Sequence, residues 1–101
     1  MNIYAILRRN GWRTPEDLEA AALRSKQVGD EQMPDDVRWI RSYVLVEDDG
    51  SLGTVCIYEA TDLEAIRRHA DTADLPADEI LPVADTVIVR PDPELATGRA
   101  G

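Results

Sequence analysis

The segment that most constrains the fold is residues 37–60, whose pattern indicates two strands joined by a polar turn. Asp-Gly stands in the turn, and this pair between β-branched or aromatic runs is a strong β-hairpin signal. Side chains alternate between the two faces of a strand, so each strand has two chemically different faces. The alternation predicts one aliphatic face and one face that gathers Trp39, Arg41, Tyr43, Cys56 and Tyr58.

The residues before the hairpin predict a strand and a helix. Alternation over residues 2–9 favours a strand that ends at the turn Asn10-Gly11. Thr14 followed by Pro15 is typical of a helix start, because threonine caps the first turn and proline suits the first helical position. We expect this helix to run to about Gln27 and to be closed by Gly29 in the usual C-terminal role of glycine.

The residues after the hairpin predict a second helix and a short strand. The pattern at residues 61–64 resembles a capping box, with Leu63 on the buried side of the helix that follows. The helix is expected to stop before Leu75-Pro76, because proline disfavours helical geometry in the preceding residue. A strand is predicted over residues 79–83, and residues 86–90 either extend it or form another.

The order βαββαβ predicts an α+β domain of the ferredoxin-like class over residues 1–90, with a flexible C-terminal tail over residues 91–101. Its four-stranded antiparallel sheet should carry both helices on one face. We expect these helices to cover an aliphatic set: Ile3, Ala5, Leu7, Ile40, Val44, Val46, Val55 and Ile57. The open face would then carry Tyr4, Ile6, Trp39, Tyr43, Leu45, Cys56 and Tyr58. Because so large an exposed patch is rare on a monomer, we expect a homodimer of the dimeric α/β-barrel type.

Composition excludes several classes of partner. The 101 residues carry a net charge of −9, which argues against nucleic acid and anionic membranes, since both require a basic surface. The only cysteine is Cys56, so a disulfide framework and a thiolate zinc cluster within one chain are excluded. Neither a signal peptide nor a membrane span of about 20 apolar residues is predicted, and a cytoplasmic location is expected.

Several short motifs, in order, resemble a known family. The runs VRWIRSYV, CIYEA and EAIRRHADTADLPADEI carry the points of likeness: Trp39, Ser42, Tyr43, Cys56, Tyr58, Glu59, Ala60, His69, Leu75, Pro76 and Ile80. This pattern is similar to a family of small bacterial ferredoxin-like domains of unknown function that includes a Streptomyces nickel-binding protein. The resemblance implies a ferredoxin-like homodimer, with nickel or another divalent transition metal as the implied cofactor of one branch. Asp74 stands where that family commonly has a glycine.

Three residues are candidate metal ligands, and each has a structural alternative. His69 is the only imidazole, so it is either a ligand or proton-transfer group, or a histidine near the end of its helix. A nickel site made of imidazoles would need His69 from two copies, with oxygen or sulfur donors. Cys56 is a soft donor or a small buried hydrophobe. Glu59 is a ligand, or it pairs with Arg38 or Arg41 across the hairpin.

Four residues are candidate ligand-binding groups. Trp39, Tyr43 and Tyr58 are expected to form the wall of a pocket, or alternatively the core of a dimer, where aromatic residues are also enriched. Arg41 on the same predicted face would require an acceptor, either a carboxylate of the partner subunit or an anionic ligand.

Three functions therefore remain open. The first is a homodimeric binding protein that takes up a metal ion or a small ligand without turnover. The second is a small cofactor-independent enzyme of the dimeric α/β-barrel type, resembling monooxygenases or isomerases, with His69, Tyr43 and Arg41 as working groups. The third is a structural or regulatory module that binds another protein. An apolar cavity between the sheet and the helices, with His69 pointing into it, would favour the enzyme.

Overall fold

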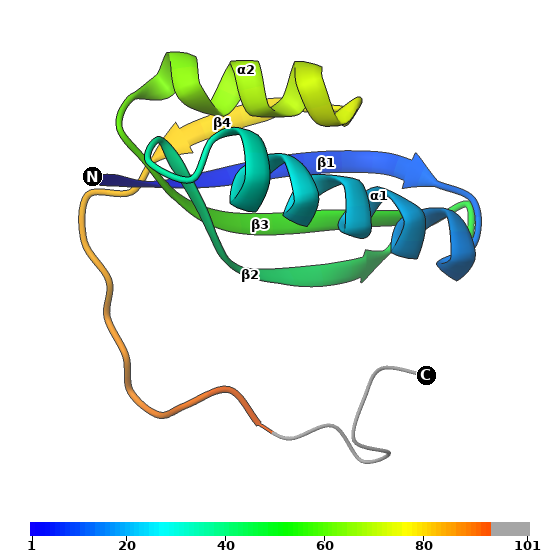
Figure 1. The fold of residues 1–101 in the computed structure, drawn as a ribbon. Coiled ribbons are helices and arrows are strands. Elements are labelled where there is room, and N and C mark those ends of the chain that lie inside the picture. The colour runs from blue at the N-terminus through cyan, green and yellow to red at the C-terminus, as the bar shows by residue number, and fades with distance from the viewer. Residues whose placement is uncertain (94–101) are drawn as a thin grey trace.

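The computed structural model describes residues 1–93 and confirms the ferredoxin-like order of elements. The strands are β1 (Asn2–Trp12), β2 (Val37–Val46), β3 (Leu52–Ala60) and β4 (Glu79–Pro82); the helices are α1 (Pro15–Gln27) and α2 (Leu63–Ala73). The strands form one antiparallel sheet in the order β2-β3-β1-β4, and both helices cover the same face of it (Figure 1). Among the described residues, no helix combines the length and the apolar character that crossing a membrane requires.

The predicted assignment of the two sheet faces is wrong for β1 and β3, whereas it holds for β2 beyond Ile40, where Val44 pairs with the buried Thr54 and Tyr43 with Val55. The helices cover the set that contains Tyr4, Ile6, Cys56 and Tyr58, all of which are buried. The aliphatic set of β1 and β3 lies on the open face, where Ile3 is exposed and Ala5, Leu7, Val55 and Ile57 are half-buried. Alternation separates two sets of side chains but does not show which set the helices cover.

A β-bulge in β2 divides the predicted ligand-binding group. The pairing register of β2 with β3 shifts between Trp39 and Arg41, so alternation is broken at Ile40. Trp39 therefore lies opposite Tyr58 on the helix-covered face, whereas Arg41 and Tyr43 pair with Ile57 and Val55 on the open face.

The first helix begins as predicted but ends differently. The hydroxyl of Thr14 accepts a hydrogen bond from the backbone N–H of Asp17, and Pro15 follows it. The chain does not terminate at Gly29 but continues through a π-helical turn, Val28–Gln32. Gly29 is buried against His69, and a Cβ there would stand 3.8 Å from the imidazole Nε2. A Cβ at this distance would make an ordinary van der Waals contact, and Gly29 does not have the left-handed backbone expected of a C-terminal stop.

The second helix is capped by Asp62, whose carboxylate accepts from the backbone N–H of Ala65. Its buried residues are Ala65, Ile66, His69, Ala70 and Ala73, while Leu63 is exposed. The helix ends at Asp74, which has a left-handed backbone with φ of 56°. Glycine favours this conformation, which explains why glycine suits this position.

The strand β1 does not end at Asn10-Gly11 as predicted, because the hairpin turn holds its distal end. Glu47 accepts hydrogen bonds from the Arg9 guanidinium, 2.9 Å away, and from the backbone N–H of Asn10, 2.8 Å away. Beside this cluster, Gly53 must lack a side chain, because a Cβ would approach the backbone carbonyl oxygen of Arg8 to 2.7 Å. Asn10 takes a left-handed φ of 51°, and the strand continues to Trp12 with a shift in register.

The segment after β4 makes no further strand among the described residues. It passes on the side of the sheet away from the helices (Figure 1), and Asp92 meets Arg41 and Tyr43 there. Between these points, Val87, Ile88 and Val89 stand in solvent. Of the predicted flexible tail, residues 94–101 lie outside the described residues.

Candidate functional site

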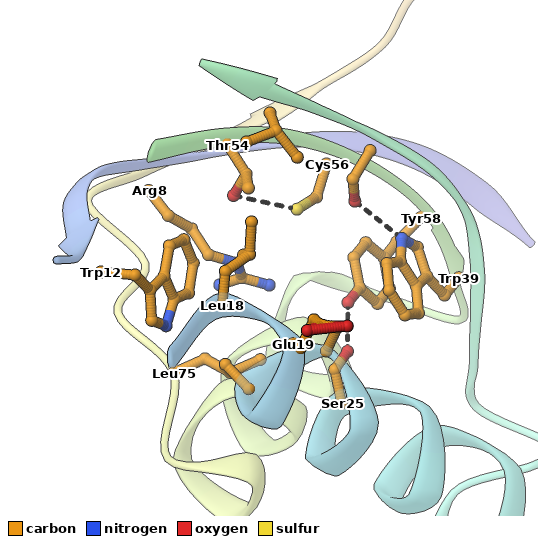
Figure 2. Close-up of a pocket in the computed structure, with 14 residues that line it drawn as sticks. Arg8, Trp12, Leu18, Glu19, Ser25, Trp39, Thr54, Cys56, Tyr58 and Leu75 are labelled. Carbon is orange, nitrogen blue, oxygen red and sulfur yellow. Dashed lines mark hydrogen bonds between the residues drawn. The ribbon is translucent and has the colours of Figure 1, made fainter. Parts of the chain in front are cut away.

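A cavity of about 290 Å³ lies between α1 and the helix-covered face of the sheet. The sheet contributes Arg8, Thr54, Cys56 and Tyr58 to its lining, and α1 contributes Leu18 and Ser25 among others (Figure 2). Both tryptophans of the chain, Trp12 and Trp39, line it as well. Most of these side chains are apolar, which is the usual lining of a small-molecule site.

Arg8 is the only charged residue of the cavity lining that is buried. Its side chain is 1% exposed, and Nη1 donates a hydrogen bond to the backbone carbonyl of Pro76. Its Nη2 atom has no hydrogen-bond partner among the described residues. Figure 2 shows the guanidinium reaching into the space between Trp12, Leu18 and Tyr58. An unpaired donor on a buried charge is costly, so this atom is poised for an acceptor.

Tyr58 joins the sheet to α1 at the centre of the site. Its hydroxyl lies 2.6 Å from the hydroxyl of Ser25, and its ring is stacked against Trp39 with centroids 6.1 Å apart. The indole N–H of Trp39 donates to the hydroxyl of Ser42 at 2.8 Å, which fixes the indole plane. Burial raises the pKa of Tyr58, so its hydroxyl stays protonated at neutral pH.

His69 is buried behind this cavity and does not line it. Its Nε2 lies 3.0 Å from the backbone carbonyl of Ser25. A carbonyl only accepts hydrogen bonds, so Nε2 carries the proton and donates it. Burial lowers the pKa of His69, which leaves the imidazole neutral at pH 7. The structure therefore places His69 between the two helices, at neither the sheet edge nor a cavity mouth.

The three candidate metal ligands do not converge within one chain. Cys56 is buried on the helix-covered face, where its Sγ lies 3.3 Å from the hydroxyl of Thr54. Glu59 points from the other face, with an Arg38 guanidinium nitrogen 3.8 Å from its carboxylate. Within residues 1–93, no three His, Cys, Asp or Glu side chains cluster in a way that would hold a metal ion.

Arg41 finds its acceptor within the same chain. Its Nη1 lies 3.2 Å from a carboxylate oxygen of Asp92, and the hydroxyl of Tyr43 donates to the same carboxylate at 2.9 Å. All three side chains are exposed on the open face. The working groups of the predicted enzyme are therefore separated, because His69 lies beneath the helices while Tyr43 and Arg41 lie across the sheet.

Arg8, Trp12 and Ser25 are among the site residues that the sequence did not predict. Arg8 stands two residues after Ile6 and four after Tyr4, so alternation alone places it on their face. An arginine on the same face of a strand as two core residues indicates a buried charge. This signal can be used only when the buried face of the sheet is known.

Comparison with known proteins identifies a family and a similar solved structure. The profile of the family described as "Nickel responsive protein SCO4226-like" matches residues 4–83. The chain belongs to this family. The crystal structure of SCO4226 from Streptomyces coelicolor A3(2) superposes with a TM-score of 0.66 at 22% sequence identity, covering 84% of this chain and 99% of that one. No protein among those with curated descriptions matches the chain.

Membership of the SCO4226-like family confirms the resemblance seen in the sequence motifs, and the structural match confirms the ferredoxin-like fold. The family description links the chain to a nickel-related role. The described residues contain no ready-made nickel site, whereas they do contain a cavity with a buried, incompletely paired arginine.

Proposed function

We propose that this member of the SCO4226-like family is a binding protein that holds a small ligand, without turnover, in the cavity between α1 and the sheet. The observation that carries the proposal is the cavity itself, which opens to solvent and is lined by aromatic and aliphatic side chains with a few polar groups among them. Nothing in the lining pairs a nucleophile with a base, because the Ser25 hydroxyl is engaged by Tyr58 and the Cys56 thiol by Thr54.

The size of the cavity limits the ligand. At about 30 Å³ for each water molecule in the liquid, 290 Å³ corresponds to about ten waters, and hence to a ligand of about ten to twelve non-hydrogen atoms. A single substituted aromatic ring fits this limit. Trp39 stacked on Tyr58 offers a flat aromatic wall against which such a ring can pack.

Tryptophan fluorescence tests this proposal directly, because both tryptophans of the chain line the cavity. 4-Nitrobenzamide and 4-nitrobenzoate are suitable probes, since nitroaromatic rings quench indole emission and have the required size. We expect saturable quenching by at least one of them. The variant Ala22→Trp fills the cavity from α1 and should abolish binding measured by equilibrium dialysis. If neither probe binds saturably, or if binding is unchanged in A22W, the proposal is refuted.

Binding of a nickel-type ion is the second candidate, and the description of the family favours it. A site made from His69, Cys56 and Glu59 needs donors from two copies and requires His69 to leave the Ser25 carbonyl. Calorimetric titration with Ni²⁺, Co²⁺, Cu²⁺ and Zn²⁺ tests this candidate. Heat that disappears in His69→Gln would support these ligands, and no heat with any of the four ions would remove the metal function.

The proposed assembly is a homodimer whose contact is the open face of the sheet. On this face, Ile3, Tyr43 and Leu81 are exposed to solvent, and the aliphatic residues between them are half-buried. The exposed run Val87–Val89 lies in the segment that passes over this same side. Apolar surface of this kind is a common mark of an interface.

A further inference from the structure

We propose that the ligand of this cavity is a small monocarboxylate with an apolar body, and that the carboxylate pairs with Arg8 Nη2. The inference rests on the proposed function, because it names the chemical class of the molecule that the cavity binds. It assigns Arg8 as the residue that selects the acid over its neutral analogues.

Of the two terminal nitrogens of the Arg8 guanidinium, only Nη2 lacks a hydrogen-bond partner among the described residues. Nη1 donates a hydrogen bond to the Pro76 carbonyl, and the centroid of the Tyr58 ring lies 5.9 Å from the guanidinium carbon. Both contacts favour a cation, but neither neutralises its charge. No carboxylate of the described residues forms an ion pair with Arg8, whereas five other cationic side chains each have one. The missing partner of a buried guanidinium is an anion.

The charge of the chain sharpens this conclusion. With a net charge of −9, the protein repels anions at long range, and a buried cation left without a carboxylate is unusual in a chain with 20 acidic residues. Glu19 lines the exposed rim of the cavity, yet no hydrogen bond joins it to Arg8 in the described structure. The Arg8 guanidinium thus lies buried inside an acidic protein without a carboxylate partner among the described residues.

The number of donors favours a carboxylate over a phosphate. The guanidinium of Arg8 carries one delocalised positive charge, which balances a monoanion but not a dianion, and its unpaired Nη2 can donate to one oxygen of that anion. The Ser25 and Tyr58 hydroxyls form the nearest polar pair of the lining, and together they have one proton beyond the bond between them. The rest of the lining is mostly apolar and suits a ring or a short branched chain.

The test compares an acid with its isosteric amide. We expect 4-nitrobenzoate to bind the wild-type chain at least tenfold more tightly than 4-nitrobenzamide, measured by quenching of Trp12 and Trp39. Arg8→Met should weaken binding of the acid by at least tenfold and change binding of the amide less than threefold. Arg67→Met, which removes an exposed positive charge from α2, is the matched control and should leave both affinities unchanged. Glu19→Gln should tighten binding of the acid two- to fivefold by removing a like charge from the rim.

The possible outcomes separate this inference from the proposed function. Equal affinity of acid and amide in the wild-type chain would overturn the carboxylate assignment and leave the cavity as a binding site. Absence of saturable binding by both probes would overturn the proposed function and the assignment together. If R8M does not fold by circular dichroism, the wild-type comparison and the Glu19→Gln shift decide the question.

Discussion

The guanidinium of Arg8 lies over the ring of Tyr58, with its central carbon 5.9 Å from the ring centroid. The two residues come from adjacent strands, and Arg8 pairs in register with Thr54, so its long side chain runs along the sheet to reach Tyr58. The Tyr58 hydroxyl, at the edge of the same ring, lies 2.6 Å from the hydroxyl of Ser25 in α1. Tyr58 therefore connects the buried charge of Arg8 to helix α1.

The unpaired charge of Arg8 predicts a gain in stability when it is removed. Arg8→Met loses one charged hydrogen bond, worth about 1.5–3 kcal/mol, but it also removes the larger desolvation cost of a buried cation. We expect the ligand-free R8M variant to be more stable than the wild type by about 1 kcal/mol. Urea unfolding followed by circular dichroism measures this, with Arg67→Met as the control. A loss of more than 2 kcal/mol would show that Arg8 is already compensated.

Asp74 predicts a gain of stability at the end of α2. The residue has φ of 56°, which glycine adopts at lower cost than aspartate. We expect Asp74→Gly to raise the free energy of unfolding by about 0.5–1 kcal/mol. Asp71→Gly is the matched control, because it removes the same charge from the same helix end but from a helical residue, and it should lower stability by about 1 kcal/mol. Thermal unfolding of both variants should shift in opposite directions.

The sequence predicts the order of elements because its signals are local. The Asp-Gly turn, the cap at Thr14, the capping pattern at residues 61–64 and the Leu75-Pro76 stop depend on residues within a few positions of each other. These signals place both helices within about one residue of their observed starts.

The faces of the sheet and the site could not be predicted because they depend on contacts between distant residues. The helices cover the aromatic set, since Tyr58 finds Ser25 and Arg8 finds the Pro76 carbonyl, and neither partner is near in sequence. The bulge at Ile40 then moves Trp39 away from Arg41 and Tyr43, which strict alternation cannot foresee. Arg8 was overlooked because the face on which it lies was expected to be open.

The lowered pKa of His69 predicts a pH dependence of stability. Burial lowers the pKa below 6.5, so the unfolded chain takes up a proton at a higher pH than the folded chain. The stability is thus fully present above about pH 6.5 and is lost as the pH falls from there through the folded pKa, by at most about 1.4 kcal/mol per pH unit.

Urea unfolding at pH 7.5, 6.5 and 5.5 measures this effect, since carboxylates titrate mainly below pH 5. His69 is the only histidine, so His69→Gln should flatten the dependence over this range, and the amide can still donate to the Ser25 carbonyl. An equal slope in wild type and H69Q would show that His69 is not the group responsible.

The open face predicts an assembly that a single charge can break. Ala5 pairs with both Ile57 and Leu81 and so lies near the middle of this face, where it is half-buried. We expect the wild-type chain to sediment as a dimer and Ala5→Asp as a monomer, because a buried carboxylate opposite two apolar residues costs more than such a contact returns. Leu23→Asp adds the same charge at an exposed position of α1 and should leave the dimer intact. A wild-type chain that sediments as a monomer at every concentration would contradict the proposed interface, since the aliphatic residues of the sheet would then remain in water.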